Sequence, residues 1–365
     1  MTDTMSPNSL AEPREQLWRA VGDGDETRAV TLVRRLLDTA EPERTSSTTD
    51  GSAAAAQLRA AGERVLLELI APTQERIGLA WAANDITVAQ EHAATAISER
   101  CAAAVADATV PALRDAPKGR VLVACVDGEW HSLPARLVGE VLRLRGWRVD
   151  YLGAQVPTEH LVAHMHHTRT QAVLLSSSIP TLLPGAHNAI NSCQAAGVPV
   201  LAGGRAFGPQ GRYARLMRAE WAEDAAGAAD LLDRSPAQPG AHAARLPAVD
   251  LPHLDDQEYS MVHRTKPQLV KQALADVETG FPEMRQYSAY QRERTVEDIH
   301  HIVSYLATAL YVDDPDLFTG FITWTADILT ARGVPARCLL PALDSLLNQL
   351  KDFPRTSAIL TAAHG

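Results

Sequence analysis

The amino-acid sequence predicts an α/β domain built on a doubly wound parallel sheet, flanked by two helical regions. The prediction rests on short apolar segments that alternate with stretches of helical length. The apolar segments are residues 120–126, 148–153, 172–178 and 198–204, and the helical stretches are 133–145, 158–168 and 183–196. Strands that are apolar on both faces and alternate with helices are typical of a parallel sheet covered on both sides. A weaker fifth strand is expected at 218–222, followed by a helix at 223–233.

The residues before the alternating pattern predict a helical bundle. Apolar side chains recur at three- and four-residue spacing over residues 9–40 and 54–108. A polar segment rich in turn-forming residues, 41–52, separates these two stretches. We expect a four-helix bundle of the up-and-down type over residues 9–115, followed by the sheet domain over residues 119–234.

The C-terminal part predicts a third domain, over residues 251–365, that is wholly helical. Residues 235–250 hold several prolines and show little periodicity, so we expect a linker there. The amphipathic segments are 295–312, 314–333 and 336–353. The boundary signals are Thr295 with Asp298, which resembles a capping box, Asp314-Pro315 as a helix start and Gly333 as a helix stop. A globin-like arrangement is one form that such a domain could take.

Composition and charge argue against several classes of protein. The chain has no apolar run long enough to span a bilayer, and its first residues lack the apolar core of a secretory signal. Its four cysteines lie far apart without a Cys-x-x-Cys pair, which indicates reduced thiols. The formal net charge is -10, and no basic stripe typical of nucleic-acid binding is visible. We therefore expect a cytoplasmic protein that binds neither membranes nor nucleic acid.

Three motifs directly follow predicted strands. They are Gly128-Glu129-Trp130-His131 after the first strand, Ser176-Ser177-Ser178 at the end of the third and Gly203-Gly204 at the end of the fourth. In a flavodoxin-like strand order the ligand crevice lies between the first and third strands, so the motifs would line one crevice. Glu129 suits His131 as a metal ligand, because the acid can hold the second ring nitrogen. A lone histidine would more often be a surface residue, but three coincident strand ends favour a site.

These motifs resemble the cobalamin-binding domain of methionine-synthase type, whose signature is D-x-H-x-x-G, then S-x-L, then G-G. The resemblance covers residues 9–234, including the helical cap. It implies a corrinoid cofactor whose cobalt is held from below by His131, while the cofactor's own base inserts into the sheet domain. The implied cofactor contacts are Glu129, Trp130, Ser176, Ser178, Gly203 and Gly204. The sequence departs from the signature where Glu129 replaces aspartate, Pro134 replaces glycine and Ser178 replaces leucine.

A second set of candidate residues lies in the bundle, where Trp81 is followed after nine residues by Glu91-His92. Composition alone favours a structural tryptophan and a solvated helical turn. The spacing is, however, similar to that of the bacterial photoreceptor regulators that use adenosylcobalamin to control carotenoid genes. This resemblance implies that Trp81 covers the adenosyl group, that Glu91 hydrogen-bonds to it, and that His92 takes the upper cobalt position after photolysis.

Aromatic, histidine and arginine side chains gather in the C-terminal domain. Such a mixture suits a pocket for a planar anionic ligand, and it suits the core of a dimerising bundle equally well. The order of the domains resembles the photocobilins, in which a biliverdin-binding helical domain accompanies the cobalamin domain. The resemblance implies biliverdin as a second chromophore. The candidate pocket residues are Tyr287, Arg292, Arg294, His300, His301 and Tyr305.

Together these features predict a light sensor that binds adenosylcobalamin and changes its quaternary structure on illumination. We expect a light-dependent homo-oligomer, a dimer or tetramer, that acts on a downstream protein. The photoreceptor regulators carry an N-terminal DNA-binding module, whereas this sequence begins at the bundle, so we expect no comparable action on DNA. No catalytic triad, phosphate-binding loop or acid pair indicates an enzyme. The alternatives are a corrinoid protein for methyl transfer and a cobalamin-responsive interaction module that does not respond to light.

Overall fold

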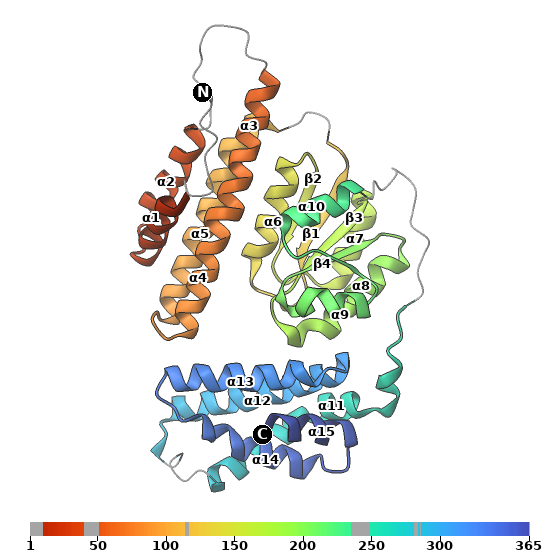
Figure 1. Cartoon of the computed structure of the whole chain (residues 1–365). Helices are drawn as coiled ribbons and strands as arrows, with labels where there is room; N and C mark the ends of the chain where they lie inside the picture. Colours follow the sequence, from red (N-terminus) through yellow and green to blue (C-terminus); the bar gives the residue numbers. More distant parts are fainter. Residues whose placement is uncertain are drawn as a thin grey trace. The chain divides into compact units, whose positions relative to one another are not determined.

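The computed structural model divides the chain into two compact units, Met1–Ala248 and Val249–Gly365. It describes residues 10–39, 51–113, 117–234, 248–280, 284 and 286–364. Most of the expected linker, residues 235–247, lies outside the described residues. The bundle and the sheet domain, expected as separate domains, pack together within the first unit. Figure 1 shows the order of the elements along the chain.

The N-terminal part is helical, as predicted. Its elements are α1 (Ala11–Gly22), α2 (Glu26–Asp38), α3 (Gly51–Arg64), the π-helical turn η2 (Val65–Ile70), α4 (Ala71–Ala82) and α5 (Val88–Thr109). The first predicted stretch is divided at Asp25, whose carboxylate caps the start of α2 by accepting a hydrogen bond from the Arg28 backbone N–H. In the second stretch α3, η2 and α4 follow one another directly, so they form one long helix that runs antiparallel to α5 (Figure 1).

Pro72 lies inside this long helix without breaking it. Because proline has no N–H, the carbonyl of Glu68 loses its ordinary helical donor. The side chain of Arg14, on α1, donates its Nε–H to that carbonyl at 2.6 Å. The π-helical turn before the proline provides the local adjustment, with the Ala71 N–H bonded to the Leu66 carbonyl. The helix therefore continues to Ala82 and carries Trp81 in its last turn.

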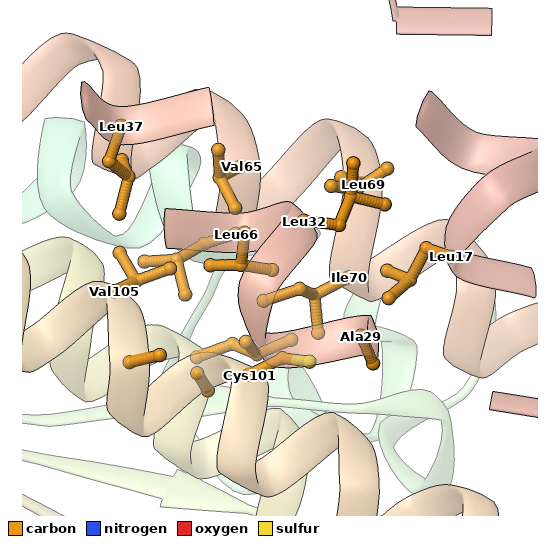
Figure 2. Packing of buried hydrophobic residues seen from close by; sticks show 14 of the residues in the cluster. Leu17, Ala29, Leu32, Leu37, Val65, Leu66, Leu69, Ile70, Cys101 and Val105 are labelled. Atoms are coloured by element: carbon orange, nitrogen blue, oxygen red, sulfur yellow. The ribbon is translucent and has the colours of Figure 1, made fainter. Parts of the chain in front are cut away.

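The core of the bundle extends to a helix of the sheet domain. Figure 2 shows part of this core, where buried side chains such as Leu17, Leu66 and Cys101 gather from different helices. Helix α6 (Ser132–Leu144), the first helix after the first strand, contributes a stripe of apolar residues to the same core. The stripe consists of Leu133, Leu137, Val141 and Leu144. Its spacing places all four residues on one face of the helix, so α6 joins the bundle to the sheet.

A five-stranded parallel sheet forms the second half of the first unit. Its strands are β1 (Arg120–Cys125), β2 (Arg148–Gly153), β3 (Ala172–Ser176), β4 (Val200–Gly203) and β5 (Glu220–Trp221). Its remaining helices are α7 (Thr158–Thr168), α8 (Leu183–Ala195), the short α9 (Arg212–Leu216) and α10 (Ala225–Arg234). The strand order is β2-β1-β3-β4-β5 and all the pairings are parallel. This is the predicted flavodoxin-like order, with its reversal between β1 and β3.

All the secondary-structure elements that the structure describes in the second unit are helical, as predicted. Its helices are α11 (Glu258–Gly280), α12 (Ala289–Val312), α13 (Pro315–Ala331), α14 (Leu340–Gln349) and α15 (Pro354–His364). Helices α11 and α15 were not predicted. The expected start of α12 was wrong: Ser288 and Gln291 form the capping box, whereas the Thr295 hydroxyl donates to the Gln291 carbonyl. A globin-like arrangement of these helices stays a prediction.

Two other helix boundaries in the second unit are confirmed, and a third is not. Asp314 caps α13 by accepting a hydrogen bond from the Asp316 N–H. Gly333 follows the end of that helix with a φ of 73°, a conformation that glycine adopts without steric cost. The segment 336–353, expected as one helix, instead forms a 3-10 turn followed by α14, which ends at Gln349. Among the described residues, no helix combines the length and the apolar character needed to cross a membrane.

Candidate functional site

The three predicted motifs meet at one edge of the sheet. Cys125, the last residue of β1, pairs with Ser176, which in turn pairs with Gly203 of β4. The chain leaves β1 through a turn in which Gly128 has a φ of 82°. A side chain at Gly128 would be strained by this φ, and its Cβ would lie 3.1 Å from Leu182. The turn places the side chain of Glu129 inside the protein.

Glu129 is the most constrained polar residue of the site, with a fully buried side chain. Its Oε2 atom accepts hydrogen bonds from the backbone N–H groups of Ser178 at 2.6 Å and Ile179 at 3.1 Å, and from the Ser177 hydroxyl at 3.2 Å. Burial alone would raise the pKa of this carboxyl, but the hydrogen bonds from His131 and Ser178 outweigh it and lower the pKa to about 2. Glu129 is therefore a buried carboxylate whose negative charge is stabilised by hydrogen-bond donors.

The hydrogen bonds of His131 define which ring nitrogen carries the proton. Its Nδ1 atom lies 2.6 Å from Oε1 of Glu129, which also accepts from the His131 backbone N–H at 3.0 Å. Its Nε2 atom lies 2.8 Å from the indole nitrogen of Trp130, a group that can only donate. The proton therefore sits on Nδ1, and Nε2 presents its lone pair. This is the form in which a histidine binds a metal, with a carboxylate on its other nitrogen.

The serines and glycines at the strand ends have roles that the sequence did not predict. Ser178 donates a hydrogen bond to Glu129 through its backbone N–H and not through its hydroxyl. The hydroxyl that binds Glu129 belongs to Ser177, which was not among the predicted site residues. Gly204 has a φ of 97°, and a Cβ there would lie 2.2 Å from the Ser177 carbonyl oxygen. Gly204 is thus required for close packing of the backbone. Ser176 is buried, and a Cβ at Gly203 would meet only ordinary contacts.

Pro134 stands where the signature has glycine. It lies in the first turn of α6, where backbone N–H groups have no partner within the helix. Proline therefore removes no helical hydrogen bond at this position. The replacement is compatible with the loop that carries His131.

The upper set of residues lies at one end of the α4–α5 hairpin. Trp81 is in the last turn of α4 and Glu91 is in the first turn of α5. The Asn84 N–H bonds to the Trp81 carbonyl at 3.0 Å, and Asn84 itself has a φ of 64°, so the connection is tight. Thr87 and Gln90 form a capping box at the start of α5. The connection brings Trp81, Glu91 and His92 to the same end of the bundle.

Glu91 and His92 form a second carboxylate–histidine pair. The Nδ1 atom of His92 lies 2.8 Å from Oε2 of Glu91, and the side chain of His92 is 75% exposed. The other oxygen of Glu91 accepts from the Thr95 hydroxyl at 2.9 Å, and that hydroxyl accepts from the Gln74 side-chain amide at 2.7 Å. As at His131, a carboxylate lies beside Nδ1, so Nε2 is the nitrogen that could bind a metal.

The residues predicted to bind biliverdin in the second unit do not all lie on one surface. Successive residues of an α-helix are about 100° apart, which places Arg294, His301 and Tyr305 on one face of α12 and Arg292 and His300 on others. The Arg292 guanidinium binds Glu278 of α11 at 2.7 Å, and that of Arg294 binds Glu297 at 2.6 Å. Tyr287 is half-buried against the helical core.

The face of α12 that carries Tyr305 is aromatic. The Tyr305 ring is stacked on Phe321 of α13, with ring centroids 3.7 Å apart and an interplanar angle of 8°. Trp324 lies 6.3 Å from Phe321 between centroids and is 47% exposed. Burial raises the pKa of Tyr305 to about 12, so its hydroxyl stays protonated. Phe321 was not predicted, because a phenylalanine at helical spacing is typical of an ordinary hydrophobic core.

Comparisons with known proteins match two regions of the first unit. Residues 119–230 match the family model of the B12 binding domain, and residues 13–105 match a second model with the same description. The chain is 31% identical over 166 residues to the HTH-type transcriptional repressor CarA of Myxococcus xanthus. That match covers 45% of this chain and 47% of the repressor, so the chain spans about half the length of this relative.

Solved structures of corrinoid proteins also match the chain, at lower similarity. The monomethylamine corrinoid protein of Methanosarcina barkeri is 19% identical with a TM-score of 0.46, and the match covers 62% of this chain and 100% of that one. A cobalamin-binding protein of Desulfitobacterium hafniense DCB-2 is 19% identical with a TM-score of 0.34, covering 60% of this chain and 96% of that one.

The family matches support a cobalamin-binding protein. They cover the bundle that carries Trp81, Glu91 and His92 and the sheet domain that carries Glu129 and His131. The residues also fit a cobalt corrinoid on chemical grounds. A neutral imidazole with its lone pair on Nε2 and a carboxylate on Nδ1 is the donor that such a metal requires.

Proposed function

We propose that this chain is a cytoplasmic light sensor that binds adenosylcobalamin between the bundle and the sheet domain, and that it acts by changing its assembly and not as an enzyme. When bound, adenosylcobalamin would supply a weak cobalt–carbon bond that visible light breaks. The observation that carries the proposal is the presence of two carboxylate–histidine pairs, Glu129–His131 and Glu91–His92, in the two matched regions. Each pair presents one imidazole nitrogen for cobalt.

The lower pair holds the cofactor in place. His131 would bind cobalt through Nε2, after the Trp130 indole has released that nitrogen. Glu129 keeps the proton on Nδ1 and increases the basicity of the imidazole. Because Glu129 is fixed by Ser177, Ser178 and Ile179, the ring has little freedom to rotate away.

The upper pair provides the response. Trp81 would cover the adenosyl group, Glu91 would hydrogen-bond to it, and His92 would supply a second imidazole ligand for cobalt. Most of the His92 side chain is exposed, which leaves it room to move. Movement of His92 would shift the start of α5 and thereby change the surface of the bundle, so that a local exchange of ligands would become a change of assembly.

Two alternatives use the same lower pair. A corrinoid protein for methyl transfer needs only a small apolar cover above cobalt. The hydrogen-bonded series Gln74, Thr95, Glu91 and the indole of Trp81 favour the larger and more polar adenosyl group. A cobalamin-responsive module without light sensing would require no mobile upper ligand, whereas His92 has the exposure that such a ligand needs.

Sedimentation velocity of the full chain tests the proposal. The protein is loaded with adenosylcobalamin and measured in the dark and after green light, with the cyanocobalamin-loaded protein as the control. We expect the distribution between monomer, dimer and tetramer to change on illumination of the adenosylcobalamin sample alone. An unchanged distribution would favour the module that does not respond to light, and binding of methylcobalamin in preference to adenosylcobalamin would favour methyl transfer.

We further propose that the second unit binds biliverdin as a second chromophore. The supporting observation is the aromatic face of Tyr305, Phe321 and Trp324, with His301 and Arg294 on the same side of α12. Planar tetrapyrroles stack on such rings, and the histidine and arginine suit pyrrole nitrogens and propionates. Arg292 and His300 face other directions, so they fall outside this proposed pocket.

Mixing biliverdin with the full chain tests the second proposal. We expect a red-shifted and sharpened absorption band that is weakened in Phe321→Ala and retained in Arg292→Met, the matched control on another face of the same helix. A biliverdin spectrum that the full chain leaves unaltered would contradict the proposal.

A further inference from the structure

A hydrogen bond joins the bundle directly to the loop that carries His131. The hydroxyl of Ser132 donates to Oε1 of Glu99, on α5, at 2.7 Å. Ser132 follows His131 in the chain and is the first residue of α6. A carboxylate at this position is also favoured by the N-terminal end of the α6 dipole. The contact therefore links the lower cobalt ligand to a helix of the bundle.

The same face of α5 carries the upper carboxylate. Glu91, Thr95 and Glu99 follow one another at four-residue spacing, which places their side chains on one side of the helix. Thr95 donates to Glu91 at 2.9 Å. Glu91 and Glu99 are separated by about 12 Å along the helix axis, eight residues at the rise of an α-helix. One rigid segment of α5 thus connects the Glu91–His92 pair with the His131 loop.

Ser132 is also held from the sheet. The Tyr151 hydroxyl, on β2, donates to the Ser132 carbonyl at 3.2 Å. Burial raises the pKa of Tyr151 to about 12, so this donor stays protonated. The Arg136 guanidinium lies over the Tyr151 ring, 5.5 Å from its centroid. The sheet therefore fixes the position of Ser132. The hydrogen bond from Ser132 to Glu99 then fixes α5 relative to Ser132.

We propose that the Glu99–Ser132 hydrogen bond is the pivot that fixes α5 relative to the His131 loop, so that His92 can reach the cobalt held by His131. Glu99 and Ser132 are positioning residues, since neither touches the cobalt. This inference rests on the proposed function for the role of His92. The pivot itself is a property of the protein and can be measured without light.

A second bridge between the bundle and α6 provides a matched control. Glu63 of α3 binds the Arg145 guanidinium at 2.6 Å, at the opposite end of α6 from Ser132. Glu63→Gln weakens the contact between the same two parts of the unit without touching the His131 loop. A merely structural role for Glu99 and Ser132 would give the same result as this control.

Two measurements on the full chain test the pivot. The first is hydrogen exchange of the amides of residues 135–138, the first in α6 that have helical acceptors, in the cofactor-free protein, for Ser132→Ala, Glu99→Ala and the double variant. We expect exchange to rise about ten-fold in each single variant and no further in the double variant, as for loss of one hydrogen bond to a charged acceptor. Ser132→Thr, which keeps the hydroxyl, should restore the protection.

The second measurement is the rate at which the spectrum of cobalt with two histidine ligands develops after green light. We expect this rate to fall about ten-fold in Ser132→Ala and less than two-fold in Glu63→Gln, as the pivot and not general packing positions His92. Equal effects of the two variants, or wild-type exchange and rate in Ser132→Ala, would overturn the pivot. If the wild-type protein shows no such spectrum but the exchange results hold, the light-sensor proposal fails and the pivot stands.

Discussion

The two carboxylate–histidine pairs have the same chemistry and opposite constraints. In the sheet domain Glu129 is fully buried and lies 2.6 Å from His131, and three further donors hold its second oxygen. In the bundle Glu91 lies 2.8 Å from His92, one hydroxyl holds its second oxygen, and the histidine side chain is 75% exposed. The lower pair is held by hydrogen bonds from the loop after β3, whereas the upper pair lies at the end of the α4–α5 hairpin.

The difference indicates how one site can hold a cofactor and also respond to it. His131 is 46% exposed, but its ring is oriented by a fully buried carboxylate that three donors hold, which suits a lasting bond to cobalt. Little free energy is needed to move a ligand on an exposed helical turn, which suits a bond to cobalt that forms only after the adenosyl group has left. We therefore assign retention of the cofactor to His131 and the response to His92.

The largest expected difference, in both stability and cofactor affinity, is that between Glu129→Ala and Glu91→Ala. Glu129→Ala leaves the buried donors of Ser177, Ser178 and Ile179 without an acceptor, which should lower the free energy of unfolding by about 3 kcal/mol. It also removes the partner of His131, so hydroxocobalamin affinity should fall by about 100-fold. Glu91→Ala should change the unfolding free energy by less than about 1 kcal/mol. Urea unfolding and equilibrium binding measure both, and similar effects of the two variants would contradict the assigned difference.

The pH dependence of stability should reveal the lower pair. Because the pKa of Glu129 is lowered from 4.5 to about 2, its charge stabilises the folded state above the unfolded pKa, and this contribution is lost as the pH falls through the folded value. The contribution is about 3 kcal/mol, and it should disappear between about pH 5 and pH 2. Comparing urea unfolding of the wild type and Glu129→Gln isolates it. A difference between the two proteins that is independent of pH would argue against an ionised buried Glu129.

The smallest effect is expected from Thr95, which holds Glu91. Thr95→Val removes the two part-buried hydrogen bonds of the hydroxyl, to Glu91 and from the Gln74 amide, and should lower the unfolding free energy by about 1 kcal/mol. Affinity for cyanocobalamin in the dark should be unchanged, because that cofactor lacks the adenosyl group that Glu91 would contact. Thr95→Ser keeps the hydroxyl and serves as the control. A loss of dark affinity in Thr95→Val alone would show that the upper pair also contributes to retention.

The sequence predicts the parallel sheet and the edge at which the motifs meet, because buried strands and the residues that follow them are local features of the chain. His131 was found from the carboxylate two residues before it and from its place after a strand, whereas His92 was found only because its spacing from Trp81 resembles that of the photoreceptor regulators. The partners of Glu129 could not be found, since the hydroxyl of Ser177 and the N–H groups of Ser178 and Ile179 reach it only through the fold of the β3 loop.

Other features were missed for identifiable physical reasons. The separation of Arg292 and His300 from Tyr305 follows from helical geometry, which the sequence analysis did not apply within α12. The packing of α6 into the core of the bundle depends on the stripe that includes Leu133 and Leu137, and in the sequence this stripe looks like that of an ordinary helix covering a sheet. The contact of Glu99 with Ser132 joins positions 33 residues apart in the chain, and no local pattern predicts it.

The absorption spectrum of His92→Ala, loaded with adenosylcobalamin and illuminated with green light, tests the central claim most directly. We predict that this variant binds the cofactor in the dark as the wild type does and bleaches under light. It should then lack the spectrum of cobalt with two histidine ligands that the wild-type protein develops. An unchanged spectrum after illumination would contradict the assignment of His92 as the mobile upper ligand.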